Sequence, residues 1–261
     1  MQTSFYKYQG AGNDFILIDA RDPLPVDWTP KTISYLCDRR FGIGADGLML
    51  LQNKNGYDFE MRYFNADGKE GSMCGNGGRC IVAFAKALGI IDKETNFLAV
   101  DGPHYAKISA DSAWVELQMI DVKDIQKDGA AYILNTGSPH FVKEVFQLQE
   151  KDVFKDGAAI RNSETYKAEG INVNFVENMG DHWFVRTFER GVEDETYACG
   201  TGATAVALAM AKHLHQNGDI VTPIRVLGGQ LEIRFRFDGE QFTNVFLCGP
   251  AQAVYKGEIN I

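Results

Sequence analysis

Two stretches of nearly the same design divide the chain. Cys74-Gly-Asn-Gly77 and Cys199-Gly-Thr-Gly202 each precede a long run of Ala, Val, Ile and Leu. The two cysteines are 125 residues apart (199 − 74 = 125). The same offset relates three further pairs: Gly12 and Gly137, Gly47 and Asn172, and Asn65 and Arg190. Because a fixed offset is the trace of internal duplication, the chain is expected to fold as two similar halves.

The duplication also bears on the number of domains. At 261 residues the chain is near the size at which one core stops growing, so length alone allows one domain or two. The offset places the boundary between residues 119 and 129. We therefore expect one domain over residues 1–119 and a second over residues 120–250.

Each half is predicted to be a curled antiparallel sheet around one central helix. Long helices are expected over 77–88 and 202–215, with a weaker candidate at 32–39, and the two long ones are apolar on every face, as buried helices are. Short β-rich runs separated by Gly, Asn and Asp turns predict strands. The overall class is α+β. The predicted strands are 5–8, 15–19, 57–64, 97–100, 114–119, 131–134, 141–146, 171–176, 183–188, 220–226, 231–237, 241–247 and 252–255.

Composition and charge exclude several functions. Lys and Arg number 26 and Asp and Glu 35, so the net charge is −9, the wrong sign for neutralising nucleic-acid phosphates. The longest apolar runs are far shorter than the roughly 20 residues that cross a bilayer, so no membrane association is expected. Five cysteines are too few, and odd in number, for a disulfide-framed secreted fold. We expect a cytoplasmic protein.

Cys74 and Cys199 each stand at the predicted start of a buried helix. Backbone N–H groups and the positive end of the helix dipole favour a thiolate there. The glycines beside each cysteine leave amides accessible to an anion such as a carboxylate. Each loop therefore combines a thiol with an anion-binding cradle.

Three other uses of these cysteines fit the spacing poorly. Only four residues separate Cys74 from Arg79, and Met73 replaces the His of a cysteine-phosphatase loop. Cys74 and Cys80 would lie on different sides of a helix, so no metal site is expected. A cysteine hydrolase using a base such as His140 would leave the second loop without a role.

Two matched thiols suit a reaction that is nearly symmetric about one carbon. One thiolate removes a proton from one face and the opposed thiol delivers another, which is racemisation or epimerisation. The two helix N-termini would hold the carboxylate on the reacting carbon. No cofactor motif is present, so catalysis without a cofactor is expected. The two thiols would titrate as a coupled pair.

Several motifs, in order along the chain, resemble the diaminopimelate epimerase family. The resemblance runs from residue 4 to the C-terminus. The motifs are Gly10-Ala-Gly-Asn-Asp-Phe15, Phe64-Asn-Ala-Asp-Gly68, Cys74-Gly-Asn-Gly-Gly-Arg-Cys80, Glu189-Arg-Gly191, Glu195-Thr-Tyr-Ala-Cys-Gly-Thr-Gly202, Gly249-Pro-Ala251 and Val254-Tyr255.

The resemblance implies a two-domain fold and a reaction. Each domain would be a β-barrel around a helix, with residues 251–261 returning to the first domain. The reaction would convert LL-2,6-diaminopimelate to the meso form, on the route to lysine and peptidoglycan precursors. Two alternatives stay open: a proline or hydroxyproline racemase or dehydratase of the same fold, and a non-catalytic amino-acid-binding module.

The family's functional positions map onto this sequence residue by residue. Cys74 and Cys199 match the acid/base pair, His140 and Glu189 match residues that tune the thiols, and Tyr255 matches a contact of a homodimer. The partner would be a dicarboxylic diamino acid, with Arg190 on its distal carboxylate. The substrate-binding positions are Asn13, Asn65, Gly75, Asn76, Asn172, Glu189, Arg190, Gly200 and Thr201.

The sequence departs from the family pattern at three places. Ser138 stands where the family usually has Asn before Pro-His, which shortens a donor. Gly47 stands where some members have Gln, so only backbone contacts are expected there. The segment between Glu189 and Glu195 is one residue longer than the commoner form. The remaining cysteines, Cys37, Cys80 and Cys248, are expected in the core.

Overall fold

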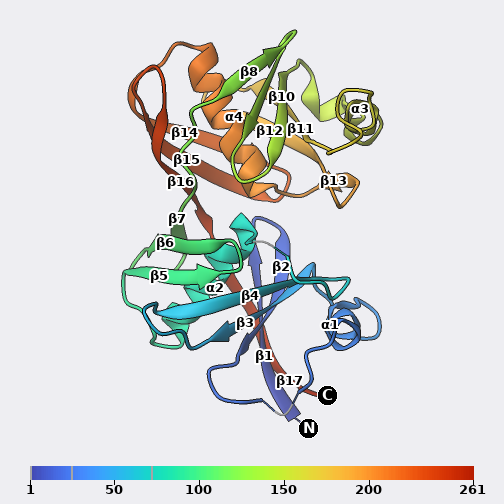
Figure 1. Cartoon of the computed structure of the whole chain (residues 1–261), viewed down its shortest axis with the longest axis vertical. Helices are drawn as coiled ribbons and strands as arrows, with labels where there is room; N and C mark the ends of the chain where they lie inside the picture. Colours follow the sequence, from blue (N-terminus) through green and yellow to red (C-terminus); the bar gives the residue numbers. More distant parts are fainter. Residues whose placement is uncertain (1, 25, 72) are drawn as a thin grey trace. The chain divides into compact units, whose positions relative to one another are not determined.

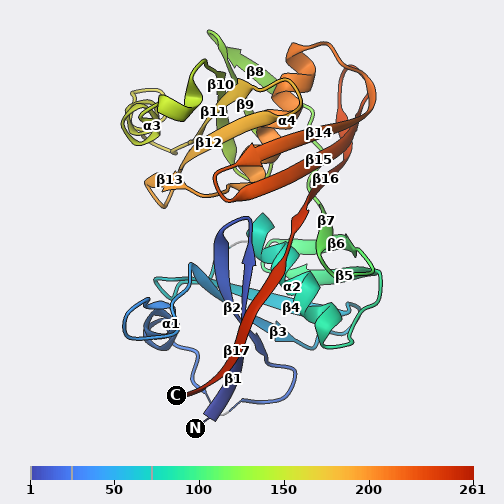
Figure 2. The ribbon, with the colours of Figure 1, turned by 180° about the vertical axis from the view of Figure 1, so that it is seen from behind.

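A computed structural model describes residues 2–24, 26–71 and 73–261 of the chain. The chain divides into two compact units (Figure 1). Unit 1 contains Met1–Leu117 together with Gly249–Ile261, and unit 2 contains Gln118–Cys248. The C-terminal strand β17 pairs antiparallel with β1 at the start of the chain, as the view from behind shows (Figure 2).

Unit 1 is a sheet with two helices. The last strand of its N-terminal segment, β7, ends at the unit boundary. Its elements are β1 (Gln2–Gly10), β2 (Asn13–Asp19), α1 (Pro30–Cys37), β3 (Gly47–Gln52), β4 (Phe59–Asn65), α2 (Gly75–Ala87), β5 (Glu94–Ala99), β6 (Gly102–Ile108), β7 (Trp114–Gln118) and β17 (Gln252–Asn260).

Unit 2 repeats this plan with its own two α-helices and a short 3-10 turn. Its elements are β8 (Ile125–Asp128), β9 (Ala131–Asn135), β10 (Pro139–Glu144), η1 (Leu148–Glu150), α3 (Val153–Arg161), β11 (Asn172–Asn178), β12 (Trp183–Glu189), β13 (Asp194–Thr196), α4 (Gly200–His213), β14 (Gly218–Val226), β15 (Gly229–Phe237) and β16 (Phe242–Pro250).

The sheet is mixed, whereas the short spacing of the strands predicted antiparallel pairing. Among the strands of the described ranges, four pairs are parallel, and a helix lies between the two strands of each pair along the chain. This is expected because parallel neighbours need a crossover connection. The pairs, with their helices, are β2 and β3 around α1, β4 and β5 around α2, β10 and β11 around α3, and β12 and β14 around α4.

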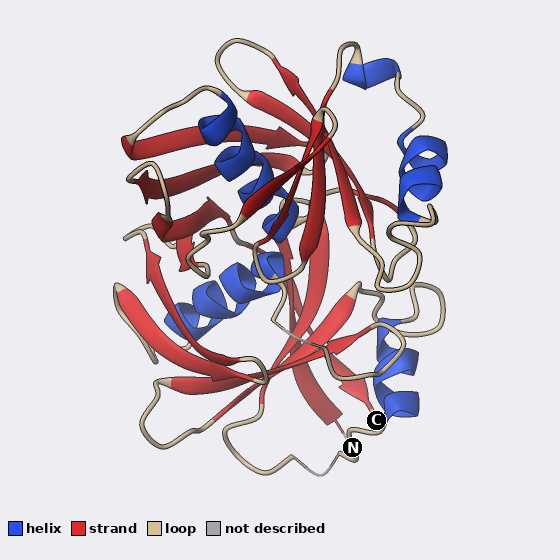
Figure 3. Cartoon of the chain, turned by 45° about the horizontal axis from the view of Figure 1, so that its top comes forward, coloured by secondary structure: helices blue, strands red, loops and turns tan. Residues whose placement is uncertain are grey.

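The helices α2 and α4 form the centre of their units. Nearly every residue of each is buried, and strands of the same unit surround each helix (Figure 3). Small residues make this possible, since Ala and Gly let the strands approach closely. The starts of the two helices, Gly75 and Gly200, are again 125 residues apart (200 − 75 = 125).

Several elements differ from the sequence-based expectations. Both long helices begin two residues earlier than predicted, directly after their cysteines. The helix α3 was not predicted, because its apolar face is narrow and only Val153 and Gly157 are buried. The strands β3, β6, β8 and β13 were also missed. β3 is a continuous apolar run without the alternation that marks a half-buried strand.

No helix in the described part of the chain is both long and apolar enough to span a bilayer. All five cysteines lie in the described ranges, and none of them forms a disulfide bond. Cys37, Cys80 and Cys248 are buried in the core. Burial raises the pKa of Cys37 and of Cys80 to about 12, so both thiols are neutral at pH 7.

The buried face of α2 gives a stability prediction. Phe84 is fully buried and its ring packs against Tyr6 and Tyr8. Phe84→Ala is expected to lower the free energy of unfolding by about 3–5 kcal/mol, because it leaves a cavity in the core. The matched control is Phe146→Ala, since Phe146 is 89% exposed and its loss is expected to change stability by less than about 0.5 kcal/mol. Urea unfolding of the two variants measures this, and equal losses would contradict the assignment of the core.

Candidate active site

Three strand ends and one helix start meet in unit 1. Asn13 begins β2, Gly47 begins β3 and Asn65 ends β4, and the strand register pairs Gly47 with both Phe15 and Asn65. The helix α2, which begins after Cys74, contacts β2 and β3. The fold therefore gathers the predicted site residues of this half along one edge of the sheet.

Cys74, Asn13 and Asn76 form a contiguous polar group at this edge. The Cys74 thiol donates to Asn13 Oδ1 over 3.7 Å, and Asn76 Nδ2 donates to the same oxygen over 3.4 Å. Cys74 is half-buried and Asn76 is fully buried. The Asn13 oxygen therefore joins the Cys74 thiol and the buried Asn76 amide in one group.

Charged side chains hold the two amides in place. Asn13 Nδ2 donates to the Asp46 carboxylate, and the buried Arg79 guanidinium donates to Asn76 Oδ1 over 2.9 Å. Asp14, next to Asn13, forms ion pairs of 2.7 Å with Lys7 and Arg39. Burial opposes ionisation of Asp14, but hydrogen bonds from Arg39 and Lys7 outweigh it and hold the Asp14 pKa well below its usual range.

Unit 2 places its predicted residues at the equivalent positions. Asn172 begins β11 and Glu189 ends β12, and Cys199 immediately precedes α4. Cys199 is 6% exposed, and its sulfur lies 3.5 Å from the Thr201 hydroxyl. The buried helix start therefore carries a thiol with a hydroxyl beside it.

His140 lies in a buried hydrogen-bonded group near this thiol. Its Nε2 is 3.0 Å from Ser138 Oγ and its Nδ1 is 3.1 Å from Asn174 Nδ2. The His140 pKa is lowered to about 3, mainly by burial and also by the positive charge of Arg190, while the hydrogen bond with Asn174 opposes both effects. The imidazole is therefore neutral at pH 7.

Glu189 ends β12, and Arg190 follows it in the turn. The Arg190 backbone N–H donates to Asn172 Oδ1 over 2.9 Å, while its exposed guanidinium donates to the Glu169 carbonyl over 3.2 Å. Glu189 accepts from the Thr196 hydroxyl over 2.9 Å. The longer turn that follows closes with the Glu193 N–H on the Glu189 carbonyl, so Arg190 keeps its contact with Asn172.

Two glycines mark places where a side chain would not fit. A Cβ at Gly202 would stand 2.3 Å from Asn174 Oδ1 and 3.3 Å from the Cys199 sulfur. A Cβ at Gly47 would meet Tyr63 at 2.6 Å. The Tyr63 hydroxyl instead donates to Asn65 Oδ1 over 3.0 Å, in the space beside Gly47. Any contact of Gly47 with a ligand is therefore a backbone contact.

The sequence did not point to Asp46, Arg79, Asn174 or the contacts of Ser138 as parts of the site. Arg79 lies in the Cys74–Cys80 motif but was assigned no role, and Asn174 lies inside a strand without a motif. Their full burial as polar groups is the signal, because a buried polar group must be paired. The burial of these side chains is known only from the folded structure.

The starts of α2 and α4 differ from the starts of α1 and α3. Thr29 and Asp152 cap α1 and α3 with side-chain hydrogen bonds, whereas Cys74 and Cys199 make no such cap hydrogen bond. Amides of a first turn have no partner within the helix and attract anions. No cluster of three or more His, Cys, Asp or Glu residues suited to a metal ion occurs in the described ranges.

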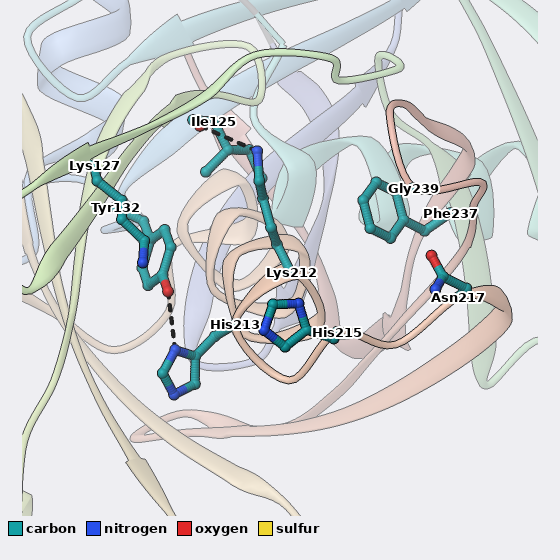
Figure 4. Close-up of a pocket in the computed structure, with 9 residues that line it drawn as sticks. All are labelled: Ile125, Lys127, Tyr132, Lys212, His213, His215, Asn217, Phe237 and Gly239. Atoms are coloured by element: carbon teal, nitrogen blue, oxygen red, sulfur yellow. Dashed lines mark hydrogen bonds between the residues drawn. The ribbon is translucent and has the colours of Figure 1, made fainter.

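A pocket of about 470 Å³ lies at the other end of α4 (Figure 4). Lys212, His213 and His215 line it, with the Tyr132 hydroxyl 2.9 Å from His213 Nδ1. Because α4 has 14 residues, this pocket is about 20 Å along the helix from Cys199. It is separate from the thiol site of this unit.

His140 gives a prediction for the pH dependence of stability. The imidazole of the unfolded chain binds a proton near pH 6.5, but in the folded protein only near pH 3. Between these values the unfolded state binds more protons, so the free energy of unfolding falls as the pH is lowered. His140→Gln cannot titrate and is expected to lose less stability between pH 7 and pH 4. Urea unfolding at both pH values measures this, and equal losses for the two proteins would contradict a neutral buried His140.

Known proteins share both the sequence and the fold. The chain matches the family model for diaminopimelate epimerase over residues 5–123 and 132–254. It is 50% identical to a diaminopimelate epimerase of Flavobacterium psychrophilum over 255 residues, covering 97% of this chain and 99% of that protein. The corresponding protein of Chlorobaculum tepidum is 42% identical over 261 residues, with 97% and 99% covered.

Solved structures of other families have the same fold at low sequence identity. A phenazine biosynthesis protein of the PhzF family from Bacillus anthracis matches with a TM-score of 0.79 at 12% identity, with both chains covered completely. A probable proline racemase from Agrobacterium radiobacter matches with a TM-score of 0.70 at 13% identity, covering 99% of this chain and 93% of that one. These two show a common α+β fold and no common activity. The near full-length matches in sequence show that this chain belongs to the diaminopimelate epimerase family.

Proposed function

We propose that this protein converts LL-2,6-diaminopimelate to the meso isomer. The observation that supports this most strongly is the repetition of one arrangement, a cysteine at the start of a buried helix, in both units. The named relatives, which match over nearly their whole length, are diaminopimelate epimerases. The protein is thus an isomerase acting on a dicarboxylic diamino acid.

The proposed step is a transfer of two protons at one α-carbon. A thiolate takes the α-proton, and the electron pair left on carbon is stabilised through the adjoining carboxylate. The second thiol then donates its proton to the opposite face, which inverts the centre. Cys74 and Cys199 are the two catalytic residues, and this exchange needs no group beyond the thiols and the amides that bind the carboxylate.

We assign the binding residues by their places around the thiols. The helix-start amides of Gly75, Asn76, Gly200 and Thr201 would hold the reacting carboxylate. Arg190 would pair with the distal carboxylate, since a guanidinium binds a carboxylate in a bidentate manner. The amides of Asn13, Asn65 and Asn172 and the carboxylate of Glu189 would bind the amino groups and remaining oxygens. His140, being neutral and buried, would act on Cys199 through the residues between them.

We also propose a reducing compartment, the cytoplasm, as the place of action. The proposed step requires two reduced cysteines, and neither Cys74 nor Cys199 forms a disulfide bond in the structure. An oxidising environment would put both catalytic sulfurs at risk of oxidation, since accessible thiolates are the reactive form.

Single cysteine substitutions test the reaction. Cys74→Ala and Cys199→Ala are each expected to lower the rate of epimerisation by at least about 10²–10⁴-fold, because one acid or base is lost. Binding of LL-diaminopimelate, measured by calorimetry, is expected to persist. Cys37→Ala is the matched control, since this thiol lies in the core on α1 and takes no part in the step. Chiral chromatography of the product gives the rates, and full activity of either catalytic variant would refute the proposal.

We further propose that the protein acts as a homodimer through β17. Val254 and Tyr255 on this strand are 56% and 47% exposed, which is unusual for large apolar side chains in adjacent positions. Tyr255→Glu is expected to give monomers in light scattering, because it would bury a charge at the contact. Val221→Glu on β14, an exposed strand position of the other unit, is the control and is expected to remain dimeric. A wild-type protein that is monomeric at micromolar concentration would contradict this assignment.

A further inference from the structure

The two catalytic thiols face different hydrogen-bonding groups. Cys74 Sγ lies 3.7 Å from the amide oxygen of Asn13, and Cys199 Sγ lies 3.5 Å from the hydroxyl of Thr201. An amide oxygen only accepts hydrogen bonds, whereas a hydroxyl can donate or accept. The protonation state favoured at Cys199 therefore depends on the direction in which the Thr201 hydroxyl points.

That direction is set several residues away, beginning at Asn174. The Thr187 hydroxyl donates to Asn174 Oδ1 over 2.9 Å, and Asn174 Nδ2 donates to the Phe141 carbonyl over 3.0 Å. These bonds fix the amide so that its second N–H donates to His140 Nδ1. Because the imidazole is neutral, its one proton is on Nε2.

Ser138 receives two hydrogen bonds. His140 Nε2–H donates to Ser138 Oγ over 3.0 Å, and Asn172 Nδ2 donates to the same oxygen over 3.0 Å. The Asn172 amide is itself fixed, because its Oδ1 accepts from the backbone N–H of Arg190. A hydroxyl oxygen has two lone pairs, so Ser138 accepts no third bond here and must donate its own hydrogen elsewhere.

The remaining partner of Ser138 is Thr201. Their hydroxyl oxygens are 3.4 Å apart, so the Ser138 hydrogen points to Thr201 Oγ1. Thr201 then has its own hydrogen available for the Cys199 sulfur. The Thr136 hydroxyl, which donates to the Thr201 carbonyl over 2.8 Å, fixes the backbone of Thr201 at this point. A donor beside Cys199 favours its anionic form.

At Cys74 the hydrogen-bond network presents an acceptor to the sulfur, not a donor. Asn13 Nδ2 faces the Asp46 carboxylate, so its Oδ1 faces the thiol. Arg79 donates to Asn76 Oδ1, which turns Asn76 Nδ2 toward the same Asn13 oxygen. An ion on each side thus fixes an acceptor beside Cys74, and an acceptor favours the protonated S–H form.

We propose that, before substrate binds, Cys199 carries the thiolate and Cys74 the proton, and that Ser138 and Asn174 are positioning residues that maintain this difference. The inference rests on the proposed function, since it assigns the starting states of the acid/base pair. It also gives a role to Ser138, which occupies a position where the family pattern has Asn. The serine can pass on hydrogen-bond direction because its hydroxyl both accepts and donates.

The charged groups around the two thiols favour the same protonation states as the hydrogen bonds do. The positive charge of Arg190 acts on His140, and a cation favours the thiolate form of a thiol in the same unit. The carboxylates of Asp14 and Asp46 lie beside Asn13 and oppose a second anion at Cys74, although cations pair with them. Other charged groups of the two units form ion pairs or hydrogen bonds, among them Lys7, Arg39, Arg79, Arg186, Glu189 and Glu195.

Alkylation as a function of pH tests the assignment in the wild-type protein. Iodoacetamide is applied for short times across pH 5–10, and mass spectrometry reports the modified fraction at Cys74 and at Cys199 separately. Comparing the pH of half-maximal rate removes the effect of accessibility. Cys199 is expected to reach half-maximal rate at least about one pH unit below Cys74. Equal values, or a lower value for Cys74, would overturn the inference.

Variants test whether the hydroxyl chain causes the difference. Thr201→Val is expected to raise the pH of half-maximal alkylation of Cys199 by about one unit and to leave that of Cys74 unchanged. Thr201→Ser is expected to restore the wild-type pH at Cys199. Ser138→Ala is expected to give a smaller shift in the same direction. Thr204→Val is the matched control, since this buried hydroxyl on α4 donates to the Gly200 carbonyl and not to sulfur.

Two results separate failure of this inference from failure of the proposed function. If Thr201→Val leaves the pH of half-maximal alkylation of Cys199 unchanged while the wild-type protein epimerises diaminopimelate, the inference is wrong and the proposed function is unaffected. Nuclear magnetic resonance of the His140 ring nitrogens adds a test that needs no substitution. The proton is expected on Nε2, and a proton on Nδ1 would break the chain at its first step.

Discussion

The backbone N–H groups in the first turn of a buried helix need hydrogen-bonding partners from outside the helix. In this fold α1 and α3 meet that need with the side chains of Thr29 and Asp152. The two central helices begin instead at Cys74 and Cys199, on residues that are poor helix caps. The same physical requirement that stabilises the outer helices therefore creates an anion-binding position beside a thiol in each unit.

The side chains behind the thiols differ although the backbones repeat. In unit 1 ions anchor the amides, with Asp46 on one side and Arg79 on the other. In unit 2 the equivalent space holds a neutral chain of donors that runs through His140. A duplicated backbone thus places a thiol at two similar helix starts, and we propose that the unequal surroundings let one sulfur serve as the base and the other as the acid.

Much of the fold could be predicted because its strongest constraints are local. Short stretches of sequence are enough to recognise the 125-residue offset, the apolar helices and the glycines beside Cys74 and Cys199. The parallel pairing around each helix was not predictable from strand spacing, since it depends on which strands meet after a crossover. The contacts of Ser138 and Asn174 could not be predicted either, because the strand register that brings them to His140 forms only in the folded chain.

The central claim is that two thiols in opposite protonation states invert one carbon. The direct measurement is the deuterium content of both isomers after brief reaction of LL-diaminopimelate in deuterated water. The account predicts deuterium at the inverted carbon of the meso product and almost none in the remaining LL substrate, because the proton removed by one thiol is not the one returned by the other. Deuterium entering the remaining LL substrate as fast as the product would contradict it, since that result requires one base to act on both faces.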